Sequence, residues 1–142
     1  MKTHWVAAFS SPATGGELPG LRRRVQARLD AEGASGPVVD RVGLLVSELA
    51  HNAAEAGCGD GRVHVVLRRE PGGLHLSVEC CGNRDFEQLA EGLALSVSKP
   101  AADAERGRGL WLVTEFSKDL RVERGRGGWV RLALVVREEA GE

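Results

Sequence analysis

The spacing of hydrophobic residues along the chain predicts helices that each bury one side. Between residues 42 and 57, apolar side chains recur every three or four positions, as on the covered side of a helix. These side chains are Val42, Leu45, Val46, Leu49, Ala53 and Ala56. The same spacing over residues 18–29 predicts an earlier helix with arginines on its polar side. Two further apolar segments predict a short helix over residues 86–95 and another over residues 110–116, which Gly107 and Gly109 open.

Alternating hydrophobic and polar residues predict strands at residues 62–69 and 74–80, joined by a hairpin turn. Shorter apolar runs predict strands at residues 5–9, 120–123 and 129–136. The chain order is then a strand, two helices, a hairpin, helical segments and a final hairpin. This order indicates a two-layer α/β sandwich with helices on one face of a mixed, mostly antiparallel sheet. We expect one domain over residues 1–142, with residues 138–142 as a disordered tail.

Composition changes this picture little, because 42% hydrophobic and 27% charged residues are ordinary values for a soluble globular protein. The net charge of -1 gives no electrostatic reason to expect binding to nucleic acid or to an anionic membrane. No apolar run approaches the roughly 20 residues that span a bilayer, and the first residues lack the apolar core of a signal peptide. The expected location is therefore the cytoplasm.

The chain has three cysteines, Cys58, Cys80 and Cys81, which lack the spacing of a metal site. An odd number with two adjacent members also argues against a disulfide framework. Buried thiols that act as small hydrophobic side chains are the commoner interpretation, and a redox switch formed by Cys80 and Cys81 is the alternative.

Two stretches carry candidate chemistry. Glu48 and Asn52 stand four residues apart at the margin of the apolar stripe, so a carboxylate and an amide lie one helical turn apart. Together they could share a hydrated cation or a phosphate, although a solvated helix edge gives the same pattern. The neighbouring His51 and Glu55 are interpreted as solvated surface residues.

The second stretch is the glycine-containing start of the later helix, formed by Arg106, Gly107, Arg108, Gly109 and Leu110. Glycines before a helix let the backbone approach a ligand, and the first helical turn offers unpaired N–H groups to a phosphate. Arg106 or Arg108 could add positive charge. A simple turn is the alternative interpretation.

Three segments resemble motifs of the GHKL, or Bergerat-fold, ATP-binding family: SELAHNAAEAG at 47–57, VECCGN at 78–83 and ERGRGLWLV at 105–113. The similarity extends over most of the chain and is greatest to the small bacterial anti-sigma-factor serine/threonine kinases. The resemblance implies that Glu48 polarises a water or a partner's serine hydroxyl, and that Asn52 holds the Mg²⁺ bridging the phosphates of ATP. It also implies that residues 106–110 and Gly82 contact the nucleotide, beneath a flexible lid over residues 96–106.

The middle motif departs from the family pattern. Cys80 stands where the family has the aspartate that accepts a hydrogen bond from adenine, and Arg84 replaces a second glycine. A thiol is a poor acceptor in comparison with a carboxylate.

Three functions therefore remain open. In the first, an ATP- and Mg²⁺-dependent anti-sigma-factor kinase sequesters a sigma factor, phosphorylates an anti-anti-sigma (STAS-type) protein, or does both. In the second, a pseudo-kinase keeps the fold and regulates by protein binding alone. In the third, the motifs are accidental and the chain is an unrelated α+β interaction domain. A homodimer is compatible with the first two.

Overall fold

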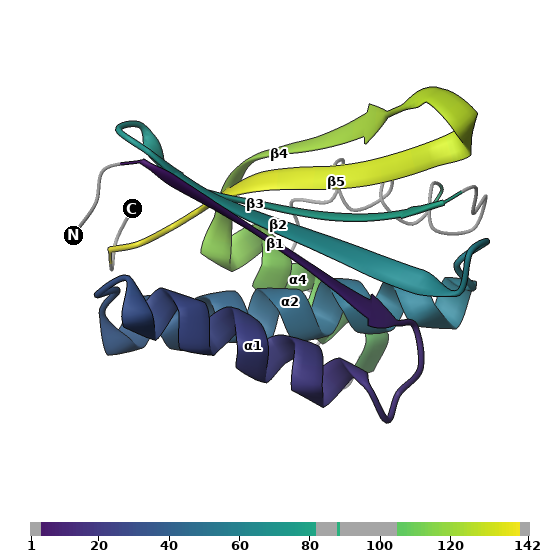
Figure 1. Ribbon diagram of the computed structural model, residues 1–142, viewed down its shortest axis with the longest axis horizontal. Coiled ribbons are helices and arrows are strands. Elements are labelled where there is room, and N and C mark those ends of the chain that lie inside the picture. The colour runs from purple at the N-terminus through teal and green to yellow at the C-terminus, as the bar shows by residue number, and fades with distance from the viewer. Residues whose placement is uncertain (1–3, 82–87, 89–104, 140–142) are drawn as a thin grey trace.

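The computed structural model describes residues 4–81, 88 and 105–139. Its main elements are β1 (Trp5–Pro12), α1 (Leu18–Ala31), α2 (Gly36–Ala56), β2 (Arg62–Glu70), β3 (Gly73–Cys81), α4 (Glu105–Phe116), β4 (Ser117–Arg124) and β5 (Trp129–Val136). The five strands form one antiparallel sheet in the order β1-β2-β3-β5-β4. All three of these helices lie on the same face of the sheet (Figure 1). The predicted two-layer sandwich is confirmed.

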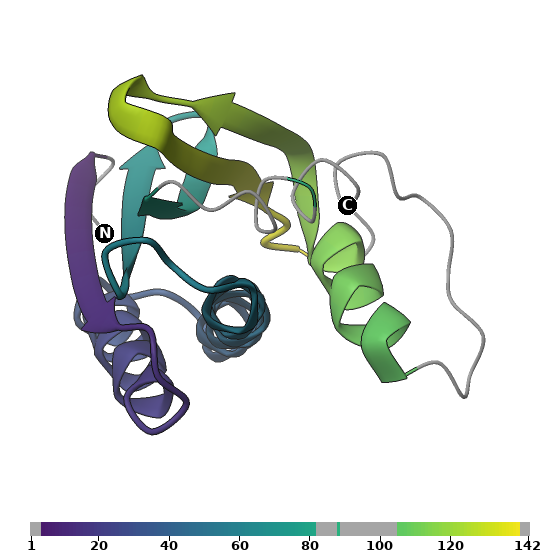
Figure 2. The same ribbon diagram turned by 90° about the vertical axis from the view of Figure 1, so that its right-hand side faces the viewer.

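Helix α2 occupies the middle of the helical layer, between α1 and α4, as the end-on view in Figure 2 shows. The hydroxyl of Ser35 accepts a hydrogen bond from the N–H of Val38 and caps its start, where Pro37 supplies a suitable φ angle. Gly57 ends the helix with a φ of 86°, a value that favours glycine. Val42, Leu45, Val46, Leu49 and Ala53 of the predicted stripe are all at most 2% exposed. The apolar periodicity therefore identified the packed side of the helix.

The sheet presents one side of each strand to the helices. On β3, Leu74, Leu76, Val78 and Cys80 are buried, whereas the alternating residues between them are half-buried on the opposite face. Strand β5 pairs with β3 on one side and with β4 on the other, so it lies inside the sheet although it comes last in the chain. The core thus joins segments from both ends of the sequence.

Several boundaries differ from the sequence prediction. Strand β1 continues to Pro12, because residues as far as Pro12 pair with β2. Strand β4 begins at Ser117, directly after α4, and a register shift between Lys118 and Arg121 accommodates Asp119 at a φ of 53°. Glu138, which the sequence placed in a disordered tail, is held by Arg69 through contacts of 2.6 and 3.0 Å. Most of the helix predicted over residues 86–95 lies outside the described residues.

No helix in the described part of the chain is long and apolar enough to cross a bilayer.

Candidate functional site

Glu48 and Asn52 both lie on α2 at the edge of its buried side, where each is half-buried. They are one turn apart, as predicted. Within the described ranges, neither side chain forms a hydrogen bond or an ion pair.

Arg41 shows which flank of α2 carries Asn52. Its guanidinium lies 5.5 Å from the ring centroid of Phe116 on α4 and donates a hydrogen bond of 2.6 Å to the carbonyl of Arg137. Asn52 follows Arg41 by eleven residues, which is about three helical turns, so both side chains project on the same side of α2. Asn52 therefore lies on the flank that faces α4.

Helix α2 connects the segments that carry the three motifs, because it contacts both β3 and α4. In Figure 2, where α2 is seen end-on, β3 lies above it and the N-terminal end of α4 lies to the right, away from β3. The first motif therefore lies on an element that borders each of the other two, whereas β3 and the start of α4 lie on different sides of α2.

Helix α4 begins at Glu105, so the residues expected to precede it lie within its first two turns. Gly107 and Gly109 are helical, and so are Arg106, Arg108 and Leu110. The predicted lid correspondingly loses its last two residues to the helix, and its remaining part lies outside the described residues, as do Gly82 and Arg84. The side chains of Arg106, Arg108 and Leu110 also lie outside the description.

Cys80 faces the core and is completely buried. Its thiol interacts with that of Cys58, which also donates a hydrogen bond of 3.5 Å to the carbonyl of Ala53. Burial, followed by the proximity of Cys58, strongly raises the pKa of Cys80. The thiol is therefore uncharged at neutral pH and is engaged inside the protein, so it does not reproduce an exposed carboxylate.

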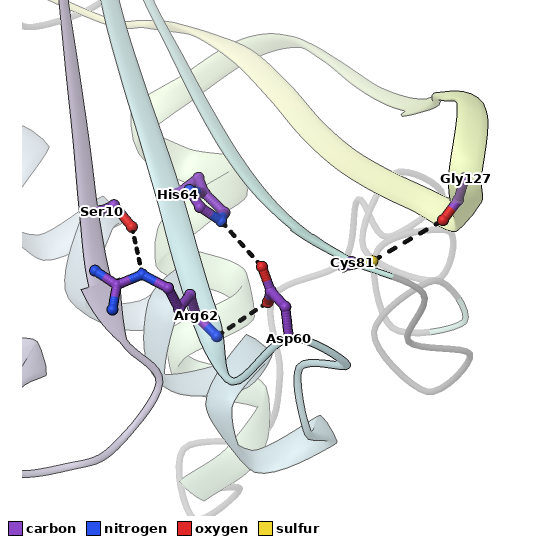
Figure 3. A network of polar contacts seen from close by, with 6 residues as sticks. All are labelled: Ser10, Asp60, Arg62, His64, Cys81 and Gly127. Atoms are coloured by element: carbon purple, nitrogen blue, oxygen red, sulfur yellow. Dashed lines mark hydrogen bonds and ion pairs between the residues drawn. The ribbon is translucent and has the colours of Figure 1, made fainter.

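The loop between α2 and β2 is fixed against the end of β3. The N–H of Gly59 donates a hydrogen bond of 3.0 Å to the carbonyl of Cys81, and a Cβ at Gly59 would lie only 2.8 Å from that oxygen. Asp60 accepts a hydrogen bond of 3.0 Å from the N–H of Arg62 and lies 3.4 Å from His64 (Figure 3). The conformation of this loop, and with it the position of Cys58, is set by these contacts.

Glu48 also borders a hollow on the other flank of α2, toward α1. This open hollow has a volume of about 280 Å³ and is lined by Gly15, Leu18, Pro19, Arg22, Ser47, Glu48 and His51. A hydrogen bond of 3.4 Å from Arg22 to Ser47 ties the two helices together there. The arginine run that contains Arg22 is interpreted from the sequence as a solvated face of its helix. Its position pointed to this contact, because Arg22 follows the buried Leu21 and borders the apolar stripe of the helix.

The His51 ring lies 3.1 Å from the Glu55 carboxylate, and both side chains are 60% exposed. Both are solvated surface residues, in agreement with their sequence interpretation.

Comparison with known proteins finds a match to a protein-family model and a similarity to a solved structure. A family model described as the histidine kinase-like ATPase domain matches residues 11–134. Among solved structures, the chain is similar to one in the crystal structure of the SiaB–SiaC complex from Pseudomonas aeruginosa, with a TM-score of 0.65 and 22% sequence identity. That similarity covers 92% of this chain and 88% of the other. A comparison with curated proteins found no match.

Proposed function

We propose, because the chain belongs to the histidine kinase-like ATPase domain family, that it binds ATP and Mg²⁺ beside α2, between β3 and α4. The observation that carries the proposal is the half-buried pair of Glu48 and Asn52, which has no internal partner among the described residues. Polar side chains that are half-buried and unpaired are costly in a folded protein unless water or a ligand satisfies them. A bound nucleotide with its metal ion would do so.

The phosphate end of such a site fits the residues present. In the described part of the chain, no group of three or more His, Cys, Asp or Glu side chains could hold a metal ion alone. The Asn52 amide oxygen would therefore be one ligand among phosphate oxygens and water, as is common for Mg²⁺. The first turn of α4 offers unpaired N–H groups and a positive dipole to the phosphates.

Bound Mg²⁺–ATP would supply the phosphoryl group, and Glu48 would act on the acceptor. Its carboxylate can accept a hydrogen bond from a serine hydroxyl or a water and orient that oxygen for attack. Phosphoryl transfer depends mainly on positioning and charge stabilisation, so these few groups would suffice. The hollow that Glu48 borders toward α1 provides an open approach for the acceptor.

The part of the site that would bind adenine fits the family pattern less well. Cys80 is fully buried, and burial together with the nearby Cys58 raises the pKa of its thiol, so it stays uncharged at neutral pH. This observation favours a second candidate, a pseudo-kinase that keeps the fold and regulates by protein binding.

For its biological role, we propose a cytoplasmic regulator of the anti-sigma-factor kinase type. The structural similarity to a chain in the SiaB–SiaC complex supports a protein partner for this fold. The partner proposed here is an anti-anti-sigma (STAS-type) protein, a sigma factor, or both. Protein binding is common to the kinase and the pseudo-kinase, and homodimerisation would be compatible with either.

Calorimetric titration with Mg²⁺–ATP tests the nucleotide site. The native chain, Asn52→Ala and Cys80→Asp would be compared, with Asp40→Asn as a control on an exposed part of α2 more than three turns from Asn52. The ATP-binding hypothesis is supported if the native chain binds, Asn52→Ala binds at least tenfold more weakly, and Asp40→Asn binds like the native chain. Binding that appears only in Cys80→Asp supports the pseudo-kinase, and no binding in any folded variant rejects the site.

A further inference from the structure

We propose that Cys58 and Cys80 form an intramolecular disulfide on oxidation, which links the loop after α2 covalently to β3. This modification site is independent of whether the protein binds a nucleotide. Its two sulfur atoms come from segments separated by 22 positions in sequence, from 58 to 80, and the hairpin of β2 and β3 begins between them.

The fold brings the two thiols together. Cys80 lies on the inner face of β3 and is fully buried, while Cys58 is half-buried and packs against the same core. The two thiols are close enough to shift each other's pKa, that of Cys58 downward and that of Cys80 upward. Because the N–H of Gly59 is bonded to the carbonyl of Cys81, the backbones beside the two cysteines are already held together. The loop after α2 and the end of β3 are therefore already held side by side next to the two thiols.

Cys81 is excluded as the partner by strand geometry. Successive side chains on a strand point to opposite faces, so Cys81 projects on the outer face of the sheet. Its sulfur lies 3.9 Å from the carbonyl oxygen of Gly127, and Figure 3 shows it turned toward that residue. Cys80 and Cys81, which the sequence suggested as an alternative redox pair, therefore point to opposite faces of the sheet.

The chemistry needs an external two-electron oxidant, for which a hydroperoxide suffices. The thiolate of the more accessible Cys58 attacks the peroxide oxygen, the O–O bond breaks, and Cys58 sulfenic acid and an alcohol or water are formed. The Cys80 sulfur then attacks the Cys58 sulfur, an S–S bond forms, and water leaves with the Cys80 proton. The two thiols are oxidised by two electrons in total, and one peroxide is reduced.

The surroundings of the pair make this oxidation slow at neutral pH. Burial raises the pKa of the Cys58 thiol, and the Asp60 carboxylate raises it further, although the contact with Cys80 opposes this. Cys80 is shifted in the same direction by burial, by Cys58, by Asp60 and by Cys81. Since the thiolate is the reacting form, the rate should increase as the pH rises above neutrality.

Mass spectrometry of the intact chain treated with hydrogen peroxide tests the site. We expect the native protein to lose two hydrogen masses, and proteolytic mapping to show a bond between Cys58 and Cys80. Cys81→Ala is the matched control and should oxidise like the native chain, whereas Cys58→Ala should not. Reduction with dithiothreitol should restore the original mass.

Thermal unfolding supplies a second measurement. A cross-link over this loop should raise Tm by roughly 5–10 °C in the oxidised native protein and in oxidised Cys81→Ala, but not in treated Cys58→Ala. Cys58→Ser is a second variant without the Cys58 thiol, and it replaces Cys58→Ala in both measurements if the alanine variant does not fold. A bond that involves Cys81, or oxidation of a folded chain to sulfinic acid without any internal bond, would overturn the proposal.

Discussion

At the scale of single residues, the ion pair between Arg69 and Glu138 joins β2 to the segment after β5. The two guanidinium nitrogens contact the two carboxylate oxygens at 2.6 and 3.0 Å, a bidentate geometry that is among the stronger polar contacts. The Arg69 side chain is 11% exposed, so solvent screens the pair only weakly. Its neighbour Arg68 offers a contrast, since it is 52% exposed and lies 3.4 Å from Glu70.

Arg69→Met should lower the free energy of unfolding by about 1–3 kcal/mol, because a partly buried carboxylate loses its partner. Arg68→Met should change it by only about 0.5 kcal/mol, as is usual for exposed ion pairs. Urea denaturation of both variants measures the difference. Equal effects would mean that the bidentate contact contributes no more than an exposed pair.

Asp60 should make stability depend on pH. Partial burial works against ionisation, but the Arg62 N–H and His64 outweigh it and lower the pKa of Asp60 below its usual range. A carboxyl group with a lowered pKa in the folded state stabilises the protein above the unfolded-state pKa, and this contribution is lost as the pH falls. Asp60→Asn should therefore be less stable than the native chain near pH 7, and the difference should shrink below about pH 4. Denaturation curves between pH 2 and 7 measure it, and a difference that stays constant would refute the argument.

At the scale of elements, the contact between α1 and α2 depends on a glycine. A Cβ at Gly43 would lie 2.1 Å from the Gln26 amide nitrogen, which donates a hydrogen bond of 3.2 Å to the carbonyl of Val39. At Gly20 on α1, the nearest atom to an added Cβ is 3.9 Å away. The two helical glycines are therefore a matched pair, one at a packed contact and one in open space.

Gly20→Ala should stabilise the protein by about 0.5–1 kcal/mol, because alanine is the better helix former. Gly43→Ala must displace Gln26 and break its hydrogen bond, so it should be at least about 1 kcal/mol less stable than Gly20→Ala. Chemical denaturation of the two variants in parallel checks this order. If both gained the same stability, the close approach of the helices would be of no energetic importance.

The elements themselves were largely predictable from the sequence. Periods of two and of three to four residues identified β2, β3 and α2, because each of these has one side against the core and one toward solvent. The start of β4 was not predictable, since its bulge is imposed by pairing with β5. For the candidate site, the four-residue spacing of Glu48 and Asn52 within an apolar helical pattern was enough to place them one turn apart on the same helix. The contact between Cys58 and Cys80 could not be foreseen, because it depends on how a loop docks on a strand from a different part of the chain.

At the scale of the whole molecule, the last strand holds the sheet together. Strand β5 provides a neighbour to both β3 and β4, and Leu132 and Leu134 are 1% exposed in the core. Val130 and Val136 on the same strand are also buried. Neither flanking strand can replace it, because β3 and β4 are not paired with each other.

A chain that ends after Gly128 should therefore not fold, whereas removal of residues 140–142 should leave the fold intact. The first truncation exposes the inner edge of β3 and leaves β4 without a partner, and it removes several buried side chains that are worth about 2–5 kcal/mol each. Circular dichroism and the cooperativity of thermal unfolding distinguish the two. A cooperative transition in the chain ending at Gly128 would contradict the central role of β5.

The position of β5 also has a consequence for biosynthesis. A ribosome releases the N-terminal segments first, so β1 to β3 and the helices α1 and α2 emerge while the middle of the sheet is still missing. Until the final strand leaves the ribosome, the growing polypeptide carries an open hydrogen-bonding edge that invites wrong pairing with other nascent chains. Residues as far as Val136 must therefore be synthesised before this sheet is protected from aggregation, and chaperones should matter most while residues 81–136 are being made.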